Sequence, residues 1–78
     1  MPTTTVIIID KMTGEPIENE RVSLIFPWGG CSEDVWTDYD GEAIIKHSST
    51  GEADLYLNGN YVGSVMTPGV IKKYKRTS

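Results

Sequence analysis

Five acidic side chains lie close together in the sequence and form its densest set of potential ligands: Glu33, Asp34, Asp38, Asp40 and Glu42. Carboxylate oxygens are preferred ligands of Ca²⁺, but an EF-hand loop needs more ligands than the Asp-Tyr-Asp-Gly stretch at 38–41 supplies. The stretch is accounted for as a tight turn, because Asp bonds to its own backbone and Gly accepts a positive φ. We predict no metal site and no cofactor. The alternative is a ligand- or Ca²⁺-binding accessory domain that uses Asp38–Glu42.

Side chains for nucleophilic catalysis are few. His47 lies in a predicted strand with serines nearby in sequence, but a catalytic triad is defined by geometry and not by residue types alone. We expect His47 to be a surface or edge residue. The single cysteine, Cys31, has Glu33 and Asp34 close by, and neighbouring acids disfavour the thiolate that a nucleophile requires. We therefore predict no catalytic residues and no enzymatic activity.

The loop Phe26–Cys31 places a large aromatic side chain in a polar, glycine-rich setting. One interpretation is a recognition loop in which Trp28 anchors a protein partner. The other is that Trp28 folds back over a thin core, with Trp36 buried nearby. Both interpretations stay open at the level of sequence. The residues assigned to the partner-binding loop are Pro27, Trp28, Gly29 and Gly30.

Charge is distributed unevenly along the chain. Four of the seven basic residues lie in the last seven positions, and residues 1–71 hold eleven acids against three basic residues, a net charge of −8. An acidic body argues against nucleic-acid binding, because contact with phosphates needs a basic face. We expect the basic C-terminal segment to be an edge strand, where lysines discourage aggregation through the open edge.

The length and the cysteine count limit what can stabilise the fold. A chain of 78 residues makes one small domain, which we place at residues 1–78, and small domains often need a disulfide, a metal or a partner. One Cys and one His exclude an intramolecular disulfide and the common zinc sites. No apolar stretch approaches the ~20 residues that span a membrane. We expect a soluble protein, cytoplasmic if the chain is full length.

The elements that must position these residues are short strands. Gly-Glu occurs three times, at 14–15, 41–42 and 51–52, each time before a strand-like run. Apolar and polar residues alternate through 20–26 and 53–57, and Asn58-Gly59 is a strong two-residue hairpin signal. Gly63 suggests a bulge or a close backbone approach. We predict an all-β fold of seven mostly antiparallel strands in a two-sheet sandwich, with a small barrel as the alternative. The expected strands cover residues 3–10, 20–26, 35–37, 43–47, 53–57, 61–66 and 70–75.

Several of the turn and strand residues also carry a family resemblance. They are Ile9-Asp10, Thr13-Gly14, Pro16-Ile17, Asn19, Val22, Leu24, Thr37-Asp38, Asp40-Gly41 and Ala43-Ile44. In this pattern the chain resembles the carboxypeptidase regulatory-like, prealbumin-like (transthyretin-like) β-sandwich family. The resemblance implies a sandwich fold. Glu20 departs from it, because the family usually has alanine there.

The resemblance also raises a hydrolase activity, which we favour least. The hydroxyisourate hydrolases of the transthyretin group end in Tyr-Arg-Gly-Ser, and residues 74–78 are similar to that ending. Those enzymes use His and Arg near their first strand, and residues 3–10 contain neither. We therefore predict a non-catalytic protein-interaction or structural module. It would use the Phe26–Cys31 loop and its sheet edges to bind protein, including further copies of itself.

Overall fold

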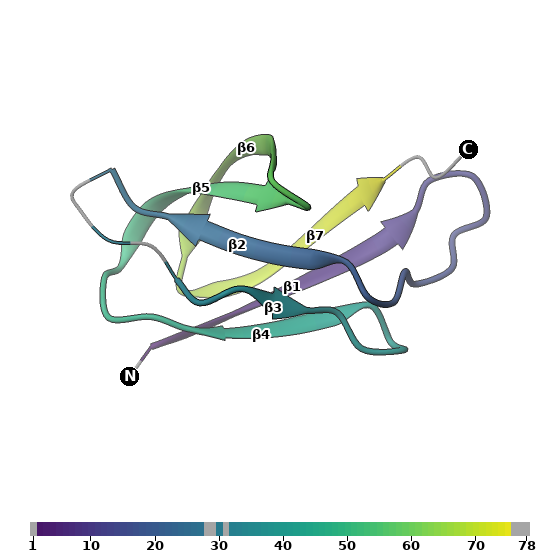
Figure 1. Ribbon diagram of the computed structural model, residues 1–78, viewed down its shortest axis with the longest axis horizontal. Coiled ribbons are helices and arrows are strands. Elements are labelled where there is room, and N and C mark those ends of the chain that lie inside the picture. The colour runs from purple at the N-terminus through teal and green to yellow at the C-terminus, as the bar shows by residue number, and fades with distance from the viewer. Residues whose placement is uncertain (1, 28–29, 31, 76–78) are drawn as a thin grey trace.

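The computed structural model describes residues 2–27, 30 and 32–75, and all regular structure in this part of the chain is β (Figure 1). The prediction of seven strands is confirmed, and the bounds differ from the expected ones by a few residues at most. The strands are β1 (Thr3–Asp10), β2 (Arg21–Ile25), β3 (Val35–Trp36), β4 (Glu42–Lys46), β5 (Gly51–Leu57), β6 (Asn60–Thr67) and β7 (Gly69–Lys75). No helix among these residues is long and apolar enough to cross a membrane.

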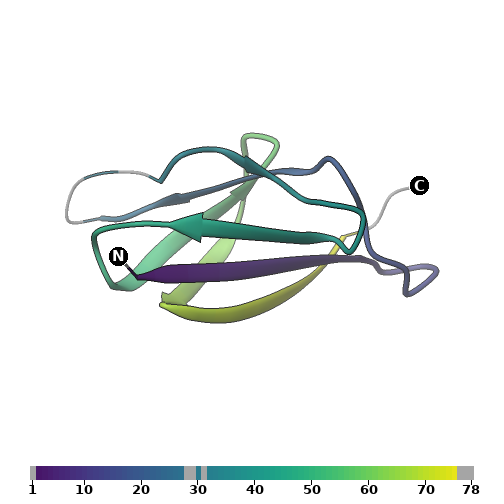
Figure 2. The same ribbon diagram turned by 90° about the horizontal axis from the view of Figure 1, so that it is seen from below.

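The strands form two sheets that are not closed into a barrel. One sheet has the order β4-β1-β7 and the other has the order β3-β2-β5-β6. In Figure 2, β4, β1 and β7 lie side by side nearest the viewer, and β5 and β6 lie behind them. The sandwich is therefore confirmed over the barrel. All pairings are antiparallel except that of β1 with β7, which brings the first and the last strand together in parallel.

The core lies between the sheets and follows from the alternation of apolar residues. A strand turns successive side chains to opposite faces, so every second residue of β1, β2, β4 and β5 points inward. Fully burying an aliphatic side chain of this kind contributes roughly 1.5–3 kcal/mol. The buried apolar side chains are Val6, Ile8, Val22, Leu24, Phe26, Ala43, Ile45, Ala53, Leu55, Leu57 and Val65.

The hairpin between β5 and β6 is confirmed. Asn58 and Gly59 have φ angles of 52° and 84° and connect Leu57 to its partner Asn60, as a two-residue turn with two positive φ angles requires. The predicted irregularity near Gly63 is also present. Gly63 pairs with Leu55 while Tyr61 pairs with Tyr56, so β6 carries an extra residue there and bulges.

β7 forms an edge of the three-stranded sheet, as the lysine pattern predicts. Its residues alternate between exposed and half-buried: Val70, Lys72 and Tyr74 are exposed, and the residues between them turn toward the other sheet. The strand thus contributes alternate side chains to the outer face of its sheet. β7 therefore forms one side of the solvent-facing surface of the three-stranded sheet.

Candidate protein-interaction surface

The acidic stretch at 38–42 forms a turn that its own backbone stabilises. One Asp38 side-chain oxygen accepts hydrogen bonds from the backbone N–H groups of Asp40 and Glu42, at 2.9 and 3.1 Å. The Gly41 N–H donates to the Asp38 carbonyl at 2.8 Å, and Gly41 has φ 74°. Within the described ranges, no three His, Cys, Asp or Glu side chains are grouped so that they could hold a metal ion. These acids act here as turn residues.

His47 follows the edge strand β4, but the expectation that its side chain lies at the surface is wrong. The side chain is 4% exposed, and its ring lies 5.3 Å from that of Phe26, centroid to centroid. Nδ1 lies 2.5 Å from the Ser49 carbonyl oxygen, and Nε2 lies 2.7 Å from the Thr4 hydroxyl oxygen. Because a carbonyl only accepts, Nδ1 donates to Ser49, and Nε2 shares a hydrogen bond with the Thr4 hydroxyl. Both ring nitrogens are thus used to hold the structure together.

A signal for this burial was present in the sequence. In β4 the inward positions are Ala43 and Ile45, both buried, and the next position in the same phase is His47. Period-two alternation therefore assigns this side chain to the core. A polar ring is tolerated there because both of its nitrogens have partners.

The predicted partner-binding loop is described only in part. Trp28 and Gly29 lie outside the described residues, as do Cys31 and residues 76–78. Pro27 and Gly30 are exposed, and the Phe26 N–H donates to the Gly30 carbonyl at 3.0 Å. The alternative interpretation placed a buried Trp36 near the loop, and this part is wrong because Trp36 is 55% exposed.

A surface that sequence reasoning missed is the outer face of the three-stranded sheet. β1 is its central strand, and while Val6 and Ile8 are buried in the core, Ile7 and Ile9 point away from it and are half-buried. A strand that reads as a continuous apolar run is typical of sheets that are covered on both faces. In the sequence, the run Val6–Ile9 is the feature that indicates a strand with apolar side chains on both faces.

The strand register arranges this outer face in rows across the sheet. Thr5 lies between Ile44 of β4 and Val70 of β7, and Ile7 lies between Glu42 and Lys72. A further row pairs Ile9 with Tyr74. Three of the flanking side chains are largely exposed: Ile44 58%, Val70 72% and Tyr74 60%. We call these eight residues of β1, β4 and β7 the outer face: Thr5, Ile7, Ile9, Glu42, Ile44, Val70, Lys72 and Tyr74.

The outer side of the four-stranded sheet differs at its centre. Its two central strands, β2 and β5, turn Ile25 and Tyr56 outward, but mixed with Ser23, Glu52 and Asp54. Exposed apolar residues such as Trp36 and Met66 lie on the edge strands. The central strand of the three-stranded sheet differs in presenting two isoleucines, Ile7 and Ile9, on its solvent side, which favours it as a contact surface.

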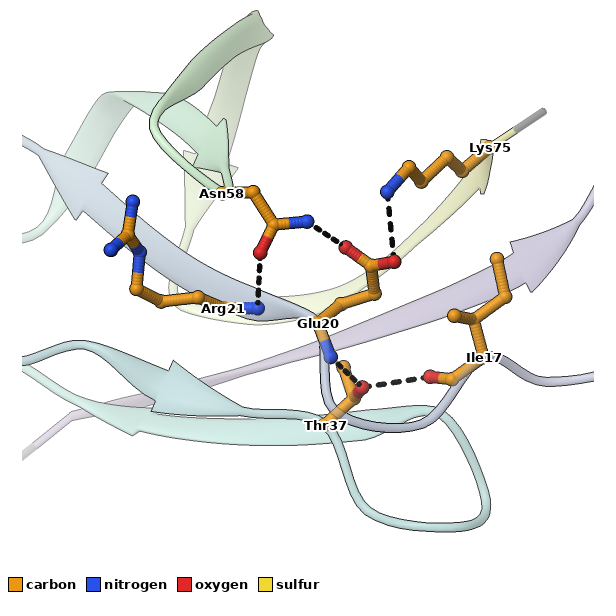
Figure 3. A network of polar contacts seen from close by, with 6 residues as sticks. All are labelled: Ile17, Glu20, Arg21, Thr37, Asn58 and Lys75. Atoms are coloured by element: carbon orange, nitrogen blue, oxygen red, sulfur yellow. Dashed lines mark hydrogen bonds and ion pairs between the residues drawn. The ribbon is translucent and has the colours of Figure 1, made fainter. Parts of the chain in front are cut away.

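Glu20 holds β7 in place against the other sheet (Figure 3). Its carboxylate is buried, with Oε1 2.8 Å from the Lys75 ammonium group and Oε2 accepting from the Asn58 amide. Asn58 Oδ1 in turn accepts from the Arg21 N–H at 3.1 Å. The network joins the end of β7, the start of β2 and the β5–β6 turn.

Thr37 completes the same network from the side of β3. Its hydroxyl accepts from the Glu20 N–H at 2.9 Å and donates to the Ile17 carbonyl at 2.7 Å. The hydroxyl thereby fixes the backbone from which the Glu20 side chain projects. The position of β7, and with it one side of the outer face, depends on this set of contacts.

We predict that Glu20→Ala lowers the free energy of unfolding by about 2 kcal/mol, because hydrogen bonds to charged groups contribute roughly 1.5–3 kcal/mol. Urea titrations of Glu20→Ala, Lys75→Ala and the double variant measure the coupling between the two side chains. We expect about 1 kcal/mol, at the upper end of the range for exposed pairs. Glu52→Ala, at an exposed position of β5, is the control and should change stability by less than ~0.5 kcal/mol. A coupling near zero would show that the ion pair does not hold β7.

The side chains of the outer face are suited to binding a partner and not to catalysis. It combines aliphatic side chains, one tyrosine ring, one acid and one lysine, on a rigid sheet whose edge strand is held by Glu20. Comparison with protein-family models, curated proteins and solved structures finds no match for this chain.

Proposed function

We propose that this protein is a non-catalytic interaction module that binds protein through the outer face of its three-stranded sheet. The observation that carries the proposal is the apolar centre of that face, Ile7 and Ile9, flanked by exposed Ile44, Val70 and Tyr74. Grouped apolar side chains on a soluble domain are typical of contact sites. The mixture of aliphatic and aromatic residues with few charges matches the centre of protein interfaces.

The proposal places the binding surface on the outer face, whereas the sequence predicted the Phe26–Cys31 loop and the sheet edges. The Phe26–Cys31 loop remains a prediction, and β-sandwich kinship with the carboxypeptidase regulatory-like family remains a proposal supported by the two-sheet fold and the Asp38–Gly41 turn. The absence of catalytic activity is supported by His47, whose ring nitrogens both contact the protein itself. These features are consistent with a module whose surface, and not a cleft, performs its function.

Site-specific photo-crosslinking tests the proposal. Val70, on the outer face, is replaced by p-benzoylphenylalanine, and Met66, on the edge strand β6, receives the same replacement as a control. The two positions are matched, being 72% and 68% exposed. Irradiation in lysate of the source cells, with the purified protein alone in parallel, should yield a discrete protein adduct from position 70 and little from position 66.

Competition separates specific from incidental adducts. Excess wild-type protein should suppress the adduct at position 70, and excess Val70→Arg protein should not, because a guanidinium in the middle of an apolar contact must be desolvated. Equal labelling at both positions, or no adduct at position 70 in any sample, would contradict the proposed binding face.

A further inference from the structure

We propose that the partner on the outer face is a second copy of this chain, stacked sheet against sheet about a two-fold axis parallel to β1. The inference rests on the proposed function and names its partner. Homodimers with two-fold symmetry are the commonest assemblies and use the same patch on both copies, so the patch must be complementary to itself. The outer face meets this requirement in its charges as well as in its apolar residues.

The charges of the middle row are complementary about an axis parallel to β1. Glu42, Ile7 and Lys72 lie side by side across β4, β1 and β7. A two-fold axis along β1 lays β4 of one copy over β7 of the other. Glu42 of each copy then faces Lys72 of the second copy, and the two Ile7 side chains meet on the axis. Two symmetric pairs of opposite charge result.

The alternative axis, perpendicular to the strands, gives the opposite result. When it passes through the middle row, it lays β4 over β4 and β7 over β7, so that Glu42 faces Glu42 and Lys72 faces Lys72. Like charges in contact are strongly unfavourable at interfaces. The charges of the middle row therefore favour an axis parallel to β1 over this arrangement.

The neighbouring rows fit the same axis. In the row of Thr5, Ile44 on β4 and Val70 on β7 lie on opposite sides of the central strand. Parallel stacking therefore places Ile44 of each copy over Val70 of the other. Ile9, in the row of Tyr74, lies close to the axis and meets its own copy. Apolar side chains thus face apolar side chains on both sides of Thr5 and at Ile7 and Ile9.

Pairing through the β7 or β6 edge is less favourable than stacking. β7 is an open edge, and its Lys72, Lys73 and Lys75 would bring like charges together if two β7 strands paired. β6, an edge of the other sheet, bulges near Gly63, and a bulge disrupts a regular ladder. The apolar surface available for self-association is therefore the outer face of the three-stranded sheet, and not the edge strand β7 or β6.

The size of the face predicts a weak dimer. The outer face spans β1, β4 and β7, which have eight, five and seven residues. With strands ~4.8 Å apart and a rise of ~3.3 Å per residue, its footprint is roughly 300 Å² per copy. Standard interfaces bury about 800 Å² per partner, and smaller ones belong to transient complexes. We expect a Kd of about 0.1–1 mM, so that association appears only at high protein concentration.

Sedimentation and NMR dilution of the purified 78-residue protein test the inference. Over a range of about 0.01–2 mM that brackets the expected Kd, the mean mass should rise toward that of a dimer. Amide shifts that change with concentration should lie in β1, β4 and β7 and not in β2 or β5. A monomer throughout the range, or shifts centred on the other sheet, would overturn the inference.

Charge reversal provides the sharper test. Glu42→Lys and Lys72→Glu should each raise the Kd by about tenfold or more, because each places like charges at both symmetric contacts. A mixture of the two variants should associate at least as well as wild type, since every contact is then between opposite charges. The matched control is a mixture of Lys11→Glu and Glu52→Lys, both exposed and off the outer face. If the control mixture associates equally, net charge and not the face is responsible, and the inference fails.

The outcomes also separate this inference from the proposed function. A purified protein that stays monomeric, while position 70 crosslinks to a different protein in lysate, would refute the homodimer and leave the binding face intact. Absence of an adduct at position 70 in both lysate and purified samples would refute both. A position-70 adduct with the mass of two copies, formed by the purified protein alone, would support both.

Discussion

Gly41→Ala should lower the free energy of unfolding by about 3 kcal/mol or more. Gly41 has φ +74°, and a left-handed conformation costs an L-residue roughly 1–2 kcal/mol. An added Cβ would lie 2.6 Å from the Ile8 carbonyl oxygen and 2.8 Å from Pro16 Cβ. Forcing extra volume into such a contact adds typically 1–3 kcal/mol.

The reason for the large effect is that three segments meet at this glycine. The Ile8 N–H donates to the Gly41 carbonyl at 2.8 Å, and the Ile17 N–H donates to the Ile8 carbonyl at 3.0 Å. The β1 backbone is therefore held on this side by the turn before β4 and by the chain after Pro16. None of these backbone groups can move without breaking a hydrogen bond of the central strand.

Gly14→Ala is the matched control for this prediction. Gly14 has a similar φ of +79°, but nothing lies within 4 Å of the position of its Cβ. This variant should lose only the conformational contribution, about 1 kcal/mol. Urea titration followed by circular dichroism measures both variants. Equal losses for the two would show that the close approach of Gly41 to β1 does not contribute to stability.

Ile8→Ala should cost about 2–5 kcal/mol, the range for removing a large aliphatic side chain from a packed core. Ile8 is fully buried at the centre of the sandwich, in the strand that joins β4 to β7. A domain of this size has a total stability of only about 5–15 kcal/mol. The substitution therefore removes a large part of it, and thermal unfolding should shift markedly downward.

Ile7→Ala, one residue earlier, is the control and carries a second expectation. Ile7 points to the outer face and is half-buried, so the loss of stability should be clearly smaller than for Ile8. If the outer face binds a second copy, the same variant should weaken dimerisation, because it removes the side chain on the proposed axis. Similar losses of stability for the two variants would contradict the assignment of inner and outer faces in β1.

Much of the fold could be predicted because its signals are local. Alternation of apolar residues indicated which side of β2 and β5 faces the core. Asn58-Gly59 indicated the hairpin that joins β5 to β6. Each of these signals extends over a few residues and depends on backbone geometry alone. The same local reasoning could have assigned His47 to the core, and it failed because residue type was given more weight than position.

The candidate surface could not be predicted in the same way. The sequence contains Glu42, Ile7 and Lys72 in three distant segments, and only the pairing of β1 with both β4 and β7 makes them one row. Glu20 and Lys75 are likewise far apart in the chain and meet because β7 packs beside β1. Such neighbours depend on which strands pair, and strand pairing is not encoded in any single window of sequence.

The sequence by itself determined that this protein is an all-β domain with seven strands, where its turns lie and which strand residues point inward, because turn chemistry and period-two alternation act over neighbouring residues. Only the tertiary structure decided that the first and last strands pair in parallel and that the second face of β1 remains open to solvent. Those outcomes depend on how two sheets divide the same strands between them, and that division follows from packing the whole chain at once.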